Sequence, residues 1–202
     1  MFSQYFVSAT ETKLQRTVRQ WLSGEEDKGG GWLENSNNEP DSVRDFGYRS
    51  SILDGVSRVD NAVYRGVLSL ILSKKARDFG PGRKQLAEIQ SDEIEDHHIY
   101  PKRFLGPYGI KGEKVNNIAN RTPLMRTTNA AIGSKAPHVY LSDAEIVGSE
   151  PVEGTVSGHL ISPSLVLTRF TLETYDQFLT DRTKRILEAI GSVVDAEPIA
   201  EA

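Results

Sequence analysis

Two adjacent histidines, His97 and His98, stand where the sequence changes from acidic to basic. The stretch EDHHIYPKRF, residues 95–104, has two acids before the pair and a lysine and an arginine after it. Cleavage of a phosphodiester requires two tasks that such a pair can divide: one neutral imidazole removes a proton from water, and the other helps to hold a divalent cation. Taken alone, such a pair is more often one exposed ring and one hydrogen-bonded ring, so the hypothesis needs further residues.

An asparagine further along the chain could complete the metal shell. Asn129 is expected near the start of a short helix capped by Thr127 or Thr128. Its neutral amide oxygen would leave a bound ion more positive than a carboxylate would. Alone, Asn120 is typical of a turn and Asn129 of a helix cap, so the hypothesis depends on the combination. Two further histidines have no partner in sequence and are expected to be surface or structural residues: His138 and His159.

Residues 91–140 are expected to position these side chains through the order strand, loop, strand, helix. Residues 93–100 can be extended, residues 118–125 can form a second short strand, and the helix that carries Asn129 follows. Such a unit could not bury enough apolar surface alone. Helices on both sides of it must therefore serve as its scaffold.

These flanking helices are predicted from apolar periodicity and capping signals. Their expected positions are residues 10–22, about 57–79, a short stretch near Leu141, and 172–190. Ser57 is the expected N-cap of the second helix, and Ser142 with Glu145 forms a capping box for the third. Gly191 is expected to close the last helix.

The predicted fold is α+β and mostly helical, with a small ββα unit embedded in a helical scaffold. We expect three parts of one compact domain: a helical scaffold over residues 1–90, the site-bearing core over 91–140, and a helical C-terminal part over 141–202. A chain of 202 residues with 38% hydrophobic and 26% charged residues has the size and composition of a globular domain.

Composition argues against several classes of protein. The chain has no cysteine, which excludes a disulfide, a thiolate nucleophile and a cysteine-based zinc site, and a reducing cytoplasm is the expected compartment. The N-terminal segment lacks a signal-peptide pattern, and no apolar run approaches the roughly 18 residues that span a bilayer. We therefore expect neither secretion nor membrane insertion.

The charge around the histidines is opposite in sign to that of the whole chain. A formal net charge of −4 gives no global attraction to nucleic acid, whereas seven basic residues and one acid between His98 and His138 give a local charge of +6. Incidental lysines on a solvated loop would look similar, but a basic surface beside a candidate metal site is expected for binding a phosphate backbone. The expected DNA contacts are Lys102, Arg103, Arg121, Arg126 and Lys135.

The combination resembles a known family. His98-Ile99-Tyr100-Pro101 preceded by His97, then Asn120, then Asn129, is similar to the HNH nuclease motif of the ββα-metal fold. The wider stretches HHIYPKRFL and NNIANRTPLMRTTNAAIGSKAPHVYL resemble the C-terminal nuclease domain of GmrSD-type restriction and phage-defence proteins. The resemblance extends to YRGVLSLILSKKARDF before the motif and YDQFLTDRTKRIL after it, so it covers roughly residues 42–187.

The resemblance implies a role for each residue of the motif. It implies His98 as general base, His97 and Asn129 as ligands of a divalent ion, and Asn120 as a residue that fixes the loop facing the base. Many relatives have Asp where His97 stands, which makes the preferred ion less defined: Mg²⁺ is expected, with Mn²⁺ or another divalent ion as the alternative. A competing register makes Asp96 the ligand and His97 the base. Because strand alternation would put Asp96 and His98 on one face, Asp96 remains a candidate second ligand.

The expected function is metal-dependent hydrolysis of double-stranded DNA by an effector domain of a restriction or anti-phage defence protein. The resemblance also implies an N-terminal nucleotide-dependent sensor domain in the same polypeptide, outside these 202 residues. Two alternatives stay open at this point. One is a non-catalytic DNA-binding module that keeps the HNH fold, and the other is a helical interaction domain with a structural metal.

Overall fold

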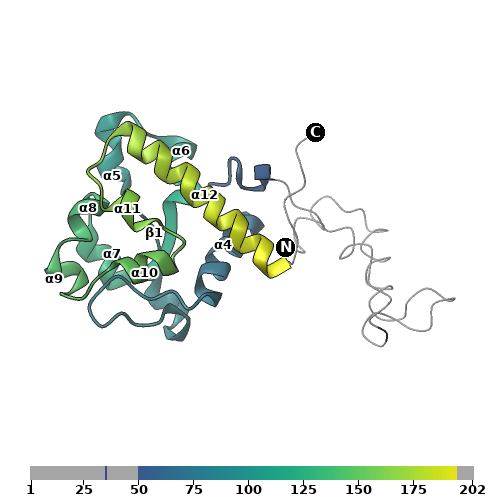
Figure 1. Ribbon diagram of the computed structural model, residues 1–202, viewed down its shortest axis with the longest axis horizontal. Helices are drawn as coiled ribbons and strands as arrows, with labels where there is room; N and C mark the ends of the chain where they lie inside the picture. The colour runs from purple at the N-terminus through teal and green to yellow at the C-terminus, as the bar shows by residue number, and fades with distance from the viewer. Residues whose placement is uncertain (1–34, 36–49, 195–202) are drawn as a thin grey trace. The chain divides into compact units, whose positions relative to one another are not determined.

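The described part of the chain consists of helices around two short antiparallel strands. The computed structural model describes Asn35 and residues 50–194, of which residues 51–194 belong to one compact unit (Figure 1). The predicted α+β, mostly helical class is confirmed. The helix predicted over residues 10–22 lies outside the described residues. None of the helices that the structure describes is both long and apolar enough to cross a membrane.

Most of the helices are short, and they lie before, between and after the two strands in the sequence. The strands are β1 (Ile94–His98) and β2 (Arg121–Met125). The α-helices are α4 (Ala62–Ser73), α5 (Lys102–Leu105), α6 (Gly112–Asn116), α7 (Arg126–Ile132), α8 (Pro137–Tyr140), α9 (Ala144–Val147), α10 (Glu153–Gly158), α11 (Pro163–Val166) and α12 (Leu172–Val194). Single 3-10 turns are η1 (Ser50–Leu53), η2 (Leu86–Glu88), η3 (Ser91–Glu93), η4 (Gly106–Tyr108) and η5 (Ile118–Asn120).

The two strands pair antiparallel, with His97 opposite Thr122 and His98 opposite Arg121. The predicted order of strand, strand and helix is confirmed, although the connection between the strands contains α5, η4, α6 and η5 in addition to loop. Side chains alternate across the sheet. Consequently Leu124 packs into one hydrophobic cluster, while Ile94 on the opposite face packs against another.

Helix α7 begins directly after β2 and is anchored by Asp78 from outside the ββα unit. The carboxylate of Asp78 accepts hydrogen bonds from the backbone N–H of Met125 at 2.8 Å and from the hydroxyl of Thr128 at 2.5 Å. The predicted cap by Thr127 or Thr128 is wrong: Met125 is the N-cap residue and supplies no side-chain cap. A distant carboxylate, which local sequence does not reveal, takes that role.

The N-cap of helix α4 lies four residues after the predicted cap, Ser57. Asn61 is the N-cap, and its Oδ1 accepts hydrogen bonds from the N–H groups of Val63 at 2.7 Å and Tyr64 at 3.4 Å. The helix ends at Ser73, and Lys75 has a positive φ of 59°, which an α-helix does not accommodate. The prediction of a helix to about residue 79 is therefore too long.

The C-terminal helix α12 is the long scaffold element that sequence periodicity predicted. Tyr175 and Phe178 near its start belong to the first hydrophobic cluster, and Ile186 further along belongs to the second. Gly191 does not close it, because the helix continues to Val194. The predicted capping box of the short helix α9 is also wrong, since Asp143 caps it through the N–H of Glu145.

Candidate active site

A pocket of about 170 Å³ lies where β1 ends. It is lined by Asp96, His97, His98, Pro101, Lys102, Arg103, Asn129 and Gly133. The fold thus brings the two histidines, two cations of α5 and an asparagine of α7 to one cavity. Asn129 is 32 residues from His97 in sequence and arrives there because α7 follows β2 without a connecting loop.

His97 is buried and faces Asn129. Its Nδ1 lies 2.7 Å from Asn129 Oδ1, and its ring meets the Tyr140 ring edge-on with 5.9 Å between centroids. Nε2 is buried and has no hydrogen-bond partner among the described residues. Burial lowers the pKa of His97 to about 3, because removal from water disfavours the imidazolium. The ring is therefore neutral at ordinary pH, the state that a metal ligand requires.

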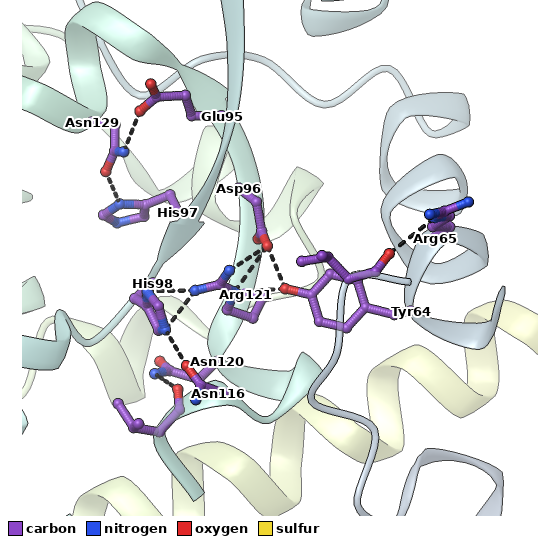
Figure 2. A network of polar contacts seen from close by, with 12 residues as sticks. Tyr64, Arg65, Glu95, Asp96, His97, His98, Asn116, Asn120, Arg121 and Asn129 are labelled. Carbon is purple, nitrogen blue, oxygen red and sulfur yellow. Dashed lines mark hydrogen bonds and ion pairs between the residues drawn. The ribbon is translucent and has the colours of Figure 1, made fainter. Parts of the chain in front are cut away.

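Glu95 fixes the other end of the Asn129 amide. Asn129 Nδ2 donates a hydrogen bond to Glu95 Oε2 at 2.7 Å (Figure 2). Arg126 Nε donates to Glu95 Oε1 at 3.1 Å. Sequence reasoning did not identify Glu95 as part of the site. Its position two residues before His97 in a strand, which puts both on one face, is the signal that could have found it.

The donors at this position fit one edge of a divalent-ion site. Two neighbouring ligands of Mg²⁺, each about 2.1 Å from the ion, lie about 3 Å apart. His97 Nδ1 and Asn129 Oδ1 are 2.7 Å apart, and because the amide oxygen can only accept, Nδ1 carries the proton of this hydrogen bond. The two atoms could bind one ion once that proton is on Nε2 instead. Across the described residues, no group of three or more His, Cys, Asp and Glu side chains is arranged to hold a metal. Water and a substrate phosphate would have to supply the remaining ligands, as is usual for Mg²⁺.

His98 lies on the opposite face of β1 with both ring nitrogens engaged. Asn116 Oδ1 is 3.0 Å from Nε2, and Arg121 Nη1 lies against both nitrogens of the ring. Burial and the Arg121 charge lower the pKa of His98, so this ring is also held neutral. Asn116 was not predicted as a site residue, and the short helix α6 that carries it was not predicted either.

Asp96 shares the face of His98 and is bound by other groups. Its Oδ2 accepts hydrogen bonds from the Tyr64 hydroxyl and from Arg121, whose Nε is 3.0 Å away (Figure 2). Burial and the neighbouring Asp96 carboxylate raise the pKa of Tyr64, which keeps its hydroxyl a donor. The structure therefore brings Asn129 together with His97 and places the Asp96 carboxylate with Arg121 instead.

Asn120 joins the two ends of the connection between the strands. Its Oδ1 accepts from the N–H of Tyr100 at 2.9 Å, and its Nδ2 donates to the carbonyls of Tyr100 at 3.1 Å and Val115 at 2.9 Å. The side chain is fully buried. Arg182 of α12 holds the adjacent residue by donating to the Ala119 carbonyl at 2.9 Å. These bonds hold the backbone of Tyr100, two residues after His98. The resemblance implies a role of this kind for Asn120, namely to fix the loop that faces the base.

The five predicted DNA-contacting cations have different surroundings. Lys102 and Arg103 are exposed, line the pocket and make no ion pair with another residue that the structure describes. Arg121 is mostly buried in its pair with Asp96, with 12% of its side chain exposed. Arg126 pairs with Glu95, and Lys135 lies 3.8 Å from Asp143. Only the first two are thus both exposed and at the pocket.

Comparison with known proteins finds one relative and no assigned family. No protein-family model matches the chain, and no solved structure matches it significantly. The chain is similar to the uncharacterized protein MJ0686 of Methanocaldococcus jannaschii, with 28% identity over 220 aligned residues. The alignment covers 96% of this chain and 36% of that protein, so the chain spans about a third of the relative's length.

Proposed function

We propose that this chain is an HNH-type, metal-dependent endonuclease that hydrolyses phosphodiester bonds of double-stranded DNA. The observation that carries the proposal is the pocket in which His97, His98 and Asn129 meet beside Lys102 and Arg103. The order of β1, β2 and α7 supports it, because that order is the one expected of a ββα-metal unit.

Each residue of the pocket has a distinct part in the proposed reaction. His98 takes a proton from the attacking water, and its neutral ring provides the required acceptor. Lys102 and Arg103 bind the phosphate backbone and carry no sequence information. His97 and Asn129 would hold the divalent ion, with Mg²⁺ expected. When bound, the ion would offset negative charge on the scissile phosphate and on the leaving 3′ oxygen.

The contacts of His98 require a rearrangement when DNA binds. A general base needs a free, unprotonated nitrogen, and both nitrogens of this ring are in contact with Asn116 or Arg121. Catalytic hydrogen bonds often reach their productive geometry only in the substrate complex. A DNA phosphate that attracted the Arg121 guanidinium would release one nitrogen, and this step belongs to the proposed mechanism.

The same contacts favour one alternative, a non-catalytic DNA-binding module. In such a module Arg121 and Asn116 would hold His98 permanently, and the bond between His97 and Asn129 would serve the fold without an ion. The exposed cations Lys102 and Arg103 would then provide the whole function. DNA binding without cleavage would be the result.

A plasmid nicking assay separates the two functions. The purified chain is incubated with supercoiled DNA in Mg²⁺ or Mn²⁺, with and without chelator, and binding is measured in parallel. Conversion to open-circular or linear DNA that stops with chelator supports the nuclease. DNA binding with no conversion in either ion would contradict it and favour the binding module.

The proposed place of this nuclease is as the effector part of a restriction or anti-phage defence protein. The support is the resemblance to GmrSD-type proteins, in which a nucleotide-dependent N-terminal domain senses modified DNA or controls cutting. We therefore expect slow nicking by this chain, with little sequence preference and no response to ATP or GTP. Strong discrimination between modified and unmodified duplexes by these 202 residues alone would contradict that assignment.

A further inference from the structure

We propose that Glu95 is a positioning residue of the candidate metal site: its carboxylate sets the orientation of the Asn129 amide, so that the amide oxygen faces His97. The inference rests on the proposed function, since it concerns the affinity of the same site for a divalent ion. It goes beyond that function by assigning a role to a residue outside the His-Asn motif.

The chemistry of the two side chains defines the orientation. An amide presents an acceptor oxygen at one end and a donor NH₂ at the other, and rotation by 180° exchanges them. An ionised carboxylate can only accept hydrogen bonds. The amide end that lies 2.7 Å from Glu95 Oε2 must therefore be the NH₂, which leaves Oδ1 for His97. Only the oxygen can bind a hard cation.

Without Glu95 the opposite orientation becomes accessible. A neutral His97 with its proton on Nε2 has a lone pair on Nδ1, which could accept a hydrogen bond from a rotated Asn129 NH₂. That arrangement would place a donor where the ion needs an oxygen.

Glu95 also contacts Arg126 of α7, which is bonded in turn to η3. Arg126 donates through Nε to Glu95 Oε1 at 3.1 Å and through Nη2 to the Asp92 carbonyl at 2.5 Å. The Glu95 side chain is 38% exposed, so this ion pair is expected to contribute little to stability. A loss of metal affinity on changing Glu95 can therefore be separated from a loss of fold.

The test measures Mn²⁺ affinity of the 202-residue chain by calorimetry or electron paramagnetic resonance, without DNA. Glu95→Ala is expected to weaken Mn²⁺ binding by about 10- to 100-fold, the range typical for residues that orient metal ligands. Glu95→Gln keeps an acceptor oxygen for the Asn129 NH₂ and should stay close to the parent. Glu188→Ala is the matched control: it removes a carboxylate from another exposed ion pair, with Lys184 on α12 and outside the pocket, and should also stay close to the parent.

A double-mutant cycle assigns the effect to the amide. In an Asn129→Ala background, the change Glu95→Ala should cost no further affinity, because no amide remains to be oriented. In the metal-free parent, the side-chain NH₂ resonances of Asn129 should show slow exchange with solvent that Glu95→Ala abolishes.

Each contrary outcome has a defined meaning. If Glu95→Gln lost as much affinity as Glu95→Ala, the carboxylate would act through its charge, and the orienting role would be overturned. Unchanged Mn²⁺ affinity in a folded Glu95→Ala protein would overturn this inference alone and leave the nuclease proposal standing. A parent chain that bound no Mn²⁺ would overturn both the metal site and the role of Glu95.

Discussion

At the scale of single residues, the two adjacent histidines differ because side chains of a strand alternate. His97 is buried and contacts Asn129 and Tyr140, whereas His98 contacts Arg121 and Asn116. Burial lowers the pKa of both rings, which keeps them neutral at pH 7. The two rings are thus both neutral but have different neighbours. This difference is compatible with the proposed roles of His97 as metal ligand and His98 as general base.

Replacement of His98 by Ala should remove the proposed nuclease activity and preserve the fold. A general base typically contributes about 10²- to 10⁴-fold to a rate, so nicking should fall by that factor while DNA binding changes little. His98 is only partly buried, which limits the cost to stability. Nicking rates in Mg²⁺, measured together with thermal unfolding, test this prediction, and His138→Ala is the matched histidine control outside the pocket.

The same assay decides between the two registers of the motif. The competing register would be correct if the His98→Ala protein nicks as fast as the parent and the His97→Ala protein is folded but inactive. His97 would then be the base and Asp96 the metal ligand. The structure gives that register less support. The Asp96 carboxylate is bound by Tyr64 and Arg121 on the face away from Asn129.

At the scale of elements, the position of α7 depends on one buried carboxylate. Asp78 accepts hydrogen bonds from the N–H of Met125 and of Gly80 and from the hydroxyl of Thr128. Asp78→Ala should lower the free energy of unfolding by about 2–3 kcal/mol, because one buried and one partly buried N–H group lose their acceptor. Mn²⁺ affinity should fall as well, since α7 carries Asn129.

Urea unfolding of Asp78→Ala and of a Thr128→Val control tests this anchor. Thr128→Val removes one of the three hydrogen bonds and leaves both backbone N–H groups paired, so it should cost clearly less. Equal stability of Asp78→Ala and the parent would show that other contacts hold α7.

The elements that could be predicted from the sequence are those whose signals are local. Apolar periodicity indicated α4 and α12, and extended segments around a turn-rich connection indicated β1 and β2. The predicted caps were wrong where a neighbouring residue also had a side chain able to cap a helix, as Asp143 did beside Ser142. They were also wrong where a distant carboxylate took that role, as Asp78 did for α7. Short helices such as α5 and α6 have too few residues to show a period.

The partners of the site residues were less predictable for the same reason. The pairing of Asp96 with Tyr64 spans 32 residues, and that of His98 with Asn116 spans 18. Such pairs depend on how helices pack around the strands, which a single sequence does not specify. Motif spacing placed His97 and Asn129 in one site, but it could not show that Glu95 faces them.

At the scale of the whole molecule, His159 joins segments that are far apart in sequence. Its Nδ1 accepts from the Thr122 hydroxyl at 2.6 Å, and its Nε2 donates to the Arg77 carbonyl at 2.7 Å. The ring is fully buried, and its centroid lies 4.7 Å from the centroid of the Phe79 ring. Burial lowers its pKa from 6.5 to about 4. The neutral form is therefore the one that links β2 to the segment after α4.

Stability should decrease as the pH falls from about 6.5 to about 4, because in that window the unfolded chain binds a proton at His159 that the folded chain does not. The difference between the two pKa values corresponds to about 3 kcal/mol, fully present above the unfolded pKa. Urea unfolding at several pH values measures it. His97 acts in the same direction, so the comparison is with His159→Gln, whose stability should depend less steeply on pH. Identical slopes would refute the assignment to His159.

The charge of the whole molecule bears on the proposed binding of DNA. With a net charge of −4, attraction must come from the local basic surface, and Lys102 and Arg103 are the exposed cations at the pocket. Reversal of both to Glu should weaken binding to duplexes of any sequence. It should also flatten the dependence of log affinity on log salt by about two units, roughly one for each lost phosphate contact. A chelator prevents cleavage during the measurement. Affinities measured in its presence at several salt concentrations, from low to moderate, give the salt slopes of the parent and of the variant.

The matched control reverses Lys184 and Arg185 on α12, which changes the net charge by the same amount on another exposed surface. This variant should lose some affinity through long-range repulsion and keep the salt slope of the parent, because it removes no phosphate contact. Equal flattening in both variants would mean that net charge alone controls binding. A parental slope in the Lys102→Glu, Arg103→Glu protein would exclude both residues from the interface, and DNA would have to approach the two histidines from another side.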